Sequence, residues 1–225
     1  MTGNRTGELL GFIDWEWIGE HWGLFASRLG EHLYLSLTPV VLGLLISLPL
    51  GLACVRWPRV YPPVLGATSV LYALPSLALF VLLLDFTGLS PATAIIPLTL
   101  YTLSVLVRNV VDGLRSVPEP VRQAASAMGF GATRRLLQVD LPIAVPLVVA
   151  GVRIATVASI SLVSVASLVG FGGLGRLFTD GFQRSFPTPI IMGIVLTVAL
   201  AVAADGLLVL AQRLLTPWAR ARRGS

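Results

Sequence analysis

The feature of this sequence that most constrains its fold is a series of long apolar runs separated by short polar segments. About 20 consecutive apolar residues in a helix are enough to cross the hydrocarbon core of a bilayer, and a helix satisfies its own backbone hydrogen bonds there. The sequence therefore predicts an all-α integral membrane protein with about five transmembrane helices. The predicted spans cover residues 33–55, 64–84, 92–111, 143–170 and 189–212.

The composition agrees with a multi-span membrane protein and excludes several chemistries. Of the 225 residues, 55% are hydrophobic and only 12% are charged, and we expect one membrane domain at residues 32–212. The formal net charge of +5 comes from arginine alone, because the chain contains no lysine. A Walker A phosphate site and a Schiff base both need lysine, so both are excluded. The arginines flank the apolar runs, which indicates contact with anionic membrane lipid and no nucleic-acid partner.

The two ends of the chain differ from the spans. Residues 1–31 mix tryptophans with acidic residues, which is typical of an arm at a membrane interface, and we expect this arm outside the cell. His21 and His32, in and just after the arm, are interpreted as interfacial polar residues rather than bases or metal ligands. Residues 213–225 form a basic tail that we expect in the cytoplasm. The single cysteine, Cys54, excludes an intrachain disulfide.

The distribution of arginine predicts the orientation of the chain. Cytoplasmic segments of membrane proteins carry an excess of Lys and Arg. With the amino terminus outside and the carboxyl terminus in the cytoplasm, the arginines of the polar segments fall mostly inside, and only Arg5, Arg28, Arg176 and Arg184 fall outside. This orientation places the segment between the third and fourth spans in the cytoplasm.

That segment, from Gln123 to Pro142, is polar and basic although it lies between two long apolar runs. Loops of this length are either functional or disordered. Its residues favour a helix, a turn at Gly129 and Gly131, because glycine reaches positive φ at little cost, and a second short helix that begins near Thr133 and ends at Pro142. The sequence predicts a helical hairpin that a partner protein can hold.

Three features of this segment stand out: Gln123-Ala124-Ala125, Gly129 six residues after Gln123, and Leu141-Pro142 at its end. Together they resemble the "EAA" loop of bacterial binding-protein-dependent ABC importer permeases. The resemblance implies a type I ABC importer permease fold, in which the loop forms cytoplasmic coupling helices that sit in a groove of the ATP-hydrolysing subunit. The family usually has Glu where this chain has Gln123, whose neutral amide can still form hydrogen bonds. An ordinary cytosolic hairpin is the alternative interpretation. The residues implied to couple to the ATPase are Gln123, Ala124, Ala125, Gly129, Arg134, Leu141 and Pro142.

A second group of motifs is similar to the glycine betaine/choline/carnitine branch of these permeases. It consists of the glycine cluster at 170–175 and the segments 74–80 and 100–101. This resemblance implies transport of a small osmoprotectant of the glycine betaine, choline, carnitine or proline type. Methionine or another amino-acid-like solute is the alternative, and an integral membrane enzyme is a further one. The cluster formally matches G-x-G-x-x-G, but it follows a span-length apolar run rather than a short strand, so a dinucleotide site is rejected.

The family resemblance also implies partners and location. The chain itself is expected to form the translocation path, while a cytoplasmic ABC ATPase dimer hydrolyses ATP, so the chain is not an enzyme. The other expected partners are a second copy of the permease or a related permease, an extracytoplasmic solute-binding protein and membrane lipid. We expect no cofactor, metal or catalytic residue, and a multi-pass location in the bacterial inner membrane.

Six residues are candidates for a gate or a pathway. Proline bends or breaks a helix, and Pro75 is the proline most central to its span, where a kink serves either gating or packing. Aromatic rings offer faces to a cationic ligand, although rings in spans more often serve packing. We expect the glycine cluster to be a flexible or tightly turned outer-face loop beside the pathway. The candidates are Pro75, Phe80, Tyr101, Gly172, Gly173 and Gly175.

Two charges fall inside apolar runs, Arg153 in the fourth and Asp205 in the fifth. Charged residues at such depth are costly and usually find partners or serve function. We expect these two to approach each other or a polar cavity. The alternative is that Arg153 extends to the inner headgroups.

Overall fold

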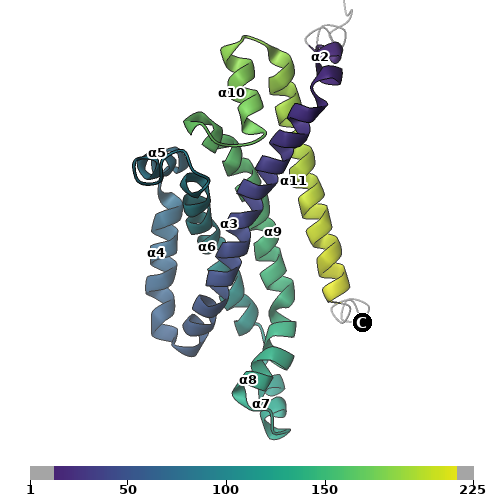
Figure 1. Ribbon diagram of the computed structural model, residues 1–225. Coiled ribbons are helices and arrows are strands. Elements are labelled where there is room, and N and C mark those ends of the chain that lie inside the picture. Colours follow the sequence, from purple (N-terminus) through teal and green to yellow (C-terminus); the bar gives the residue numbers. More distant parts are fainter. Residues whose placement is uncertain (1–12, 217–225) are drawn as a thin grey trace, which may run out of the picture.

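The computed structural model describes residues 13–216, and every regular element in this part of the chain is helical (Figure 1). Four helical segments are long and apolar enough to cross a membrane, and a fifth crossing is possible if one bent helix pair is a single span. This agrees with the predicted all-α membrane fold of about five spans. The predicted arm and basic tail lie partly outside the described residues, since they include residues 1–12 and 217–225.

Three long helices form the centre of the bundle: α3 (Trp22–Arg56), α6 (Ala92–Arg115) and α9 (Leu141–Ala166). Helix α6 packs against both of the others. Small residues allow this close approach: a Cβ atom at Gly51 of α3 would lie 2.5 Å from a methyl group of Val110 on α6. The core of the bundle therefore lies around α6.

The amino-terminal arm does not end where the first span was predicted to begin. A short helix, α2 (Trp15–Glu20), is capped by Asp14, whose carboxylate accepts a 2.9 Å hydrogen bond from the Trp17 N–H. After His21, α3 begins at Trp22 and runs without a break through the predicted boundary at residue 31. Residues 22–31 are thus the first turns of α3, and their place at the membrane interface stays a prediction.

The predicted second span is not one straight helix. Helix α4 (Tyr61–Ala73), preceded by a 3-10 turn at Pro58–Val60, and helix α5 (Ser76–Thr87) meet at an angle of 91°. Leu74 precedes a proline and has extended backbone angles, which this position favours. Pro75 has no N–H to continue the hydrogen bonds of α4. The sequence predicted a kink here, and the structure has a near right angle.

The polar segment after α6 contains α7 (Glu119–Ala127), α8 (Ala132–Arg135) and a π-helical turn (Leu136–Asp140). We call residues 119–140 the polar hairpin; it projects from one end of the bundle (Figure 1). The predicted end of the second hairpin helix at Pro142 is wrong, because the helix continues through the π-helical turn into α9. Pro142 lies in the first turn of α9, where a missing N–H is tolerated, and the wider π turn absorbs the break in hydrogen bonding.

The opposite end of the bundle carries the remaining elements. Helix α9 ends in a 3-10 turn (Ser167–Val169), and a glycine-rich turn leads to α10 (Gly175–Gln183). Helix α11 (Pro187–Leu215) then returns along α9. Figure 1 shows α10 and the polar hairpin at opposite ends of the molecule, with α11 at its edge.

Candidate functional site

The polar hairpin turns at Gly129, which has a φ of +83° that side chains other than glycine rarely adopt. The turn is closed by hydrogen bonds from the N–H of Gly129 to Ser126 O (3.0 Å) and from the N–H of Phe130 to Ala125 O (3.1 Å). Gln123 and Ala124 are exposed on α7, whereas Ala125 is buried. Two of the three predicted coupling residues of α7, Gln123 and Ala124, therefore lie on an exposed surface near the tip of the molecule, and Ala125 faces inward.

The other predicted coupling residues lie at the base and on the second arm of the hairpin. Arg134 stacks over the ring of Phe130 at 4.3 Å and donates a 3.0 Å hydrogen bond to Gln138. Leu141 packs against a buried cluster that contains Leu114 of α6. The structure thus connects the hairpin to the end of α6, and its role in coupling stays a prediction.

A buried carboxylate at the base of the hairpin was missed by the sequence analysis. Asp140 is only 6% exposed and lies between two arginines. Arg122 Nε donates to Asp140 Oδ1 at 3.3 Å, and Arg135 Nε lies 3.7 Å from Oδ2. Arg122 also donates through Nη2 to the Leu114 carbonyl at 2.6 Å. These contacts, which we call the Asp140 clamp, tie α7 to the last turns of α6 and to the start of α9.

A cavity lined by both polar and apolar side chains lies on the side of the bundle where α4 packs against α6. Its volume is about 400 Å³. Helix α6 supplies most of its wall, and α4 and α9 supply the rest. The lining residues are Ser69, Tyr72, Ser104, Val105, Arg108, Asn109 and Ile154.

The bend at Pro75 is held by a residue that the sequence analysis also singled out. The Tyr101 hydroxyl of α6 donates a 2.9 Å hydrogen bond to the Leu74 carbonyl at the bend. The Tyr101 ring also meets Tyr72 edge to face, with ring centroids 5.9 Å apart. Two of the predicted gate candidates, Pro75 and Tyr101, therefore belong to one local structure that borders the cavity through Tyr72.

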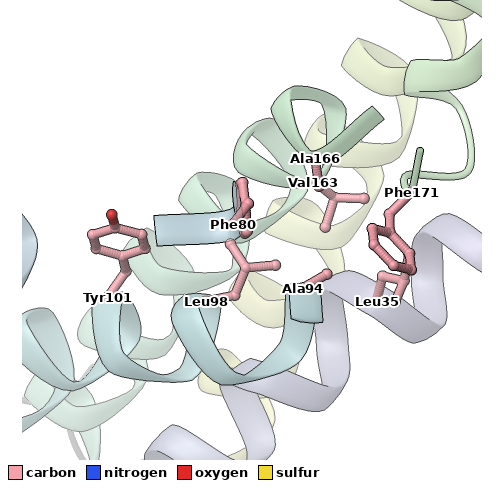
Figure 2. Close-up of a cluster of buried hydrophobic side chains, with 8 residues drawn as sticks. All are labelled: Leu35, Phe80, Ala94, Leu98, Tyr101, Val163, Ala166 and Phe171. Atoms are coloured by element: carbon pink, nitrogen blue, oxygen red, sulfur yellow. The ribbon is translucent and has the colours of Figure 1, made fainter. Parts of the chain in front are cut away.

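Phe80, another of the predicted gate or pathway candidates, is fully buried and lies among side chains of several helices (Figure 2). The cluster is formed by Leu35, Phe80, Ala94, Leu98, Tyr101, Val163, Ala166 and Phe171. In this conformation Phe80 is a core side chain that packs α5 onto α6 and α9. A role for it in gating or in the pathway stays a prediction.

The glycine cluster forms a tight turn rather than a loose loop. Gly172 and Gly173 have φ values of +116° and +42°, and a Cβ atom at Gly173 would lie 2.6 Å from backbone atoms of Arg28 and His32. A Cβ atom at Gly175 would lie 2.7 Å from the carbonyl oxygen of Ser164. Of the two predicted forms, flexible or tightly turned, the structure has the second, and these glycines allow the turn to pack directly on α3 and α9.

His32 is the centre of this packing, and its interpretation as an interfacial residue is wrong. Its side chain is fully buried. The N–H of Leu174 lies 3.3 Å from Nδ1, and Nε2 lies 3.0 Å from the Ile160 carbonyl. A neutral ring with its proton on Nε2 satisfies both contacts. Its partners are far away in sequence, so no local pattern could have indicated them.

The two intramembrane charges meet, as expected. Arg153 Nε and Nη2 donate to Asp205 Oδ1 and Oδ2, each at 2.8 Å, which is a two-point contact between α9 and α11. Gln212 donates a further hydrogen bond from α11 to the Pro146 carbonyl at 3.3 Å. These polar contacts join α11 to the bundle at its half nearer the polar hairpin.

The geometry defines a class of protein. Membrane-length helices with a partly polar cavity among them and a basic hairpin at one end are the arrangement expected of a multi-span membrane transport subunit. Within residues 13–216, no group of three or more His, Cys, Asp or Glu side chains is close enough to hold a metal ion.

Comparison with known proteins gives the family. The chain belongs to the binding-protein-dependent transport system inner membrane components, which match it over residues 32–217. It is therefore a multi-pass inner-membrane permease subunit of an ABC importer and not an enzyme. Such an importer also contains an ATPase and a substrate-binding protein.

Individual relatives cover most of the chain. The osmoprotectant import permease protein OsmW of Salmonella typhimurium is 36% identical over 200 residues, covering 87% of this chain and 93% of the relative. The glycine betaine/carnitine/choline transport system permease protein OpuCB of Bacillus subtilis is 33% identical over 195 residues, covering 87% and 90%. A solved inward-facing structure of the MetNI methionine ABC transporter has a TM-score of 0.75 at 25% identity, covering 86% of this chain and 96% of that chain.

Proposed function

We propose that this permease imports a small osmoprotectant with a quaternary ammonium group, such as glycine betaine, choline or carnitine. The observation that carries the proposal is the similarity to permeases named for these solutes. It covers 87% of the chain and so includes the spans around the cavity, not only the polar hairpin. A solute preference shared with these relatives would have to reside in such segments or in the binding protein.

We place the amino terminus outside the cell and the carboxyl terminus and polar hairpin in the cytoplasm. The excess of arginine on the proposed inner side supports this orientation. In it, α10 and the glycine turn face the solute-binding protein. Helix α11 has an apolar face that the other described residues do not cover, since no residue in its most apolar stretch is buried. That face would contact lipid or a second permease subunit.

The mechanism we propose runs through the polar hairpin. ATP binding closes the ATPase dimer and moves α7, with Gln123 and Ala124 at the contact surface. The Asp140 clamp transmits this movement to α6 and α9, which form most of the cavity wall. The cavity then changes the side of the membrane to which it opens, as packed helices move against one another.

A second candidate function is the import of methionine or a similar amino acid. The likeness to the methionine transporter in helix arrangement favours it, but that likeness is weaker in sequence than the likeness to the osmoprotectant permeases. Both candidates are zwitterions or cations of similar size, so only a transport measurement separates them.

The test uses the permease reconstituted with its ATPase and its solute-binding protein in vesicles. Uptake of labelled glycine betaine, choline, carnitine, proline and methionine is measured with and without ATP. We expect ATP-dependent uptake of at least one quaternary ammonium solute and none of methionine. Uptake of methionine alone would reject the proposed solute class in favour of the second candidate.

A further inference from the structure

The cavity contains a charge, that of Arg108, for which the described residues offer no counter-charge. Arg108 is exposed on α6, seven residues before the helix ends at Arg115, which is roughly 10 Å along the helix axis. No carboxylate among residues 13–216 forms an ion pair with it, and this includes Asp112, one turn further along α6. The contrast is Arg153, whose charge is matched by Asp205. An unmatched charge within a span is costly, so a function is the default explanation.

The groups around Arg108 are suited to an anion. Ser69, Ser104 and Asn109 line the same cavity. Asn109 uses one amide hydrogen on the Val105 carbonyl (2.9 Å), and its second amide hydrogen has no partner among the described residues. The Ser104 hydroxyl already donates to the Tyr101 carbonyl (2.8 Å), so the Arg108 guanidinium and the second amide hydrogen of Asn109 are the donors that can bind a carboxylate at two points. The cavity volume of about 400 Å³ also falls in the range of small-molecule sites, about 300–1,000 Å³.

The same cavity has an aromatic wall. Tyr72 is 53% exposed, and its ring is supported edge to face by the buried Tyr101. Quaternary ammonium groups bind against aromatic rings. The cavity therefore combines a feature that attracts a carboxylate with one that attracts a quaternary ammonium group.

From these observations we propose that the cavity between α4, α6 and α9 is a binding site for a zwitterionic solute within the membrane. Arg108 binds the solute carboxylate, and Tyr72 contacts its ammonium group. The inference rests on the proposed function, because it takes the solute to be a quaternary ammonium compound, and it adds a preference. Solutes that carry a carboxylate, such as glycine betaine and carnitine, gain a contact that choline, with a hydroxyl instead, does not.

The first test measures the charge of the cavity without relying on transport. Ser104→Cys is introduced with Cys54→Ala into the reconstituted importer, and its rate of modification is compared for anionic sulfonate and cationic trimethylammonium methanethiosulfonates. Arg108→Gln should lower the anionic-to-cationic rate ratio by about tenfold, because a unit charge at close range changes the local anion concentration by this order. Arg108→Lys should retain most of the ratio. An unchanged ratio in Arg108→Gln would overturn the anion site.

Arg115→Gln is the matched control. Arg115 lies on the same helix, but its guanidinium stacks on Tyr61 at 4.5 Å and does not line the cavity. We expect this variant to leave the ratio unchanged. If Arg108→Gln fails to insert, Arg108→Met, with an unbranched side chain of similar length, replaces it in the same comparison.

The second test measures solute preference in the complete importer. Arg108→Gln should lower the uptake of labelled glycine betaine about tenfold more than that of choline. Equal losses for both solutes would mean a structural role and would overturn the assignment. If Arg108 instead held a phospholipid phosphate, betaine uptake would be unaffected and the labelling ratio would depend on the phosphatidylglycerol content of the vesicles. If the wild-type importer takes up neither glycine betaine nor choline, the proposed function is contradicted. The ratio of anionic to cationic labelling then tests the anion site by itself.

Discussion

At the scale of single residues, Asp140 is the clearest case in which one side chain holds several elements. It is nearly buried, so its charge needs partners, and Arg122 and Arg135 provide them. Because Arg122 also binds the Leu114 carbonyl, the same guanidinium joins α6 to the polar hairpin. A hairpin held in this way can transmit a push to the spans, whereas a loosely attached one would move alone.

Asp140→Asn should weaken this transmission. The amide keeps the shape of the carboxylate but leaves two arginines without their counter-charge, a loss of about 1–3 kcal/mol at the base of the hairpin. We expect the amount of solute imported per ATP hydrolysed to fall several-fold, while the protein still inserts and binds the ATPase. Both rates are measured in the same vesicles.

Asp112→Asn is the matched control for this prediction. Asp112 is exposed near the end of α6 and forms no ion pair with a described residue. Its variant should leave the ratio of uptake to hydrolysis unchanged. Equal ratios in both variants would show that the Asp140 clamp has no part in transmission.

The pair between Arg153 and Asp205 leads to a prediction about stability. Removing one partner leaves the other charge alone in an apolar span, whereas removing both leaves none. Arg153→Leu and Asp205→Leu should each lower the melting temperature of the purified permease, and the double variant should melt at a higher temperature than either single variant. Additive losses in the double variant would show that the 2.8 Å contacts contribute no coupling energy.

At the scale of elements, the bend between α4 and α5 depends on a contact from a third helix. The helix breaks at Leu74, which has extended backbone angles, and the Leu74 carbonyl at this break accepts a hydrogen bond from the Tyr101 hydroxyl of α6. The bend is thus fixed to the central helix of the bundle. This arrangement sets the position of Tyr72 on the cavity wall.

Tyr101→Phe should loosen the bend without disturbing the packing of the ring. A single hydrogen bond of this kind contributes about 1 kcal/mol, which corresponds to a fall of roughly 2–4 °C in melting temperature for a chain of this size. Tyr72→Phe is the control for stability, because the Tyr72 hydroxyl makes no hydrogen bond with a described residue. A fall of the same size in both variants would contradict the role given to the Tyr101 hydroxyl.

The number of spans followed from the sequence, whereas the geometry of individual elements did not. The number of spans was predictable because an apolar run of span length is a local property. The angle of the bend at Pro75 was not predictable, because it depends on Tyr101, 26 positions later in the sequence, and on the cluster around Phe80. The helix through Pro142 was missed because a π-helical turn has no simple sequence pattern.

Among the site residues too, those explained by local sequence were predictable and those explained by distant partners were not. The glycine at 129 was predictable, since a turn between two short helices favours a residue that adopts positive φ. Asp140 and His32 were not, because each is explained by partners elsewhere in the chain. The pairing of Arg153 with Asp205 was expected from the high cost of isolated charges alone.

At the scale of the whole molecule, we propose that three tasks are separated along its length. In the proposed account the polar hairpin at one end is the surface for the ATPase and the cavity between α4, α6 and α9 is the place for a solute, while the tight glycine turn at the other end packs on α3 and α9 (Figure 1). The proposed account depends on contact between the polar hairpin and the ATPase, because movement of the hairpin is what switches the cavity from one side of the membrane to the other.

The most direct measurement of this claim is the accessibility of the hairpin tip. Met128 is 70% exposed there, and Met128→Cys with Cys54→Ala gives a single reactive thiol. We predict that a membrane-impermeant maleimide labels this thiol in inside-out vesicles and not in intact cells, that added ATPase subunit protects it, and that a bifunctional reagent cross-links it to that subunit. Labelling from the outside of intact cells, or a tip that neither is protected by the ATPase nor cross-links to it, would contradict the account.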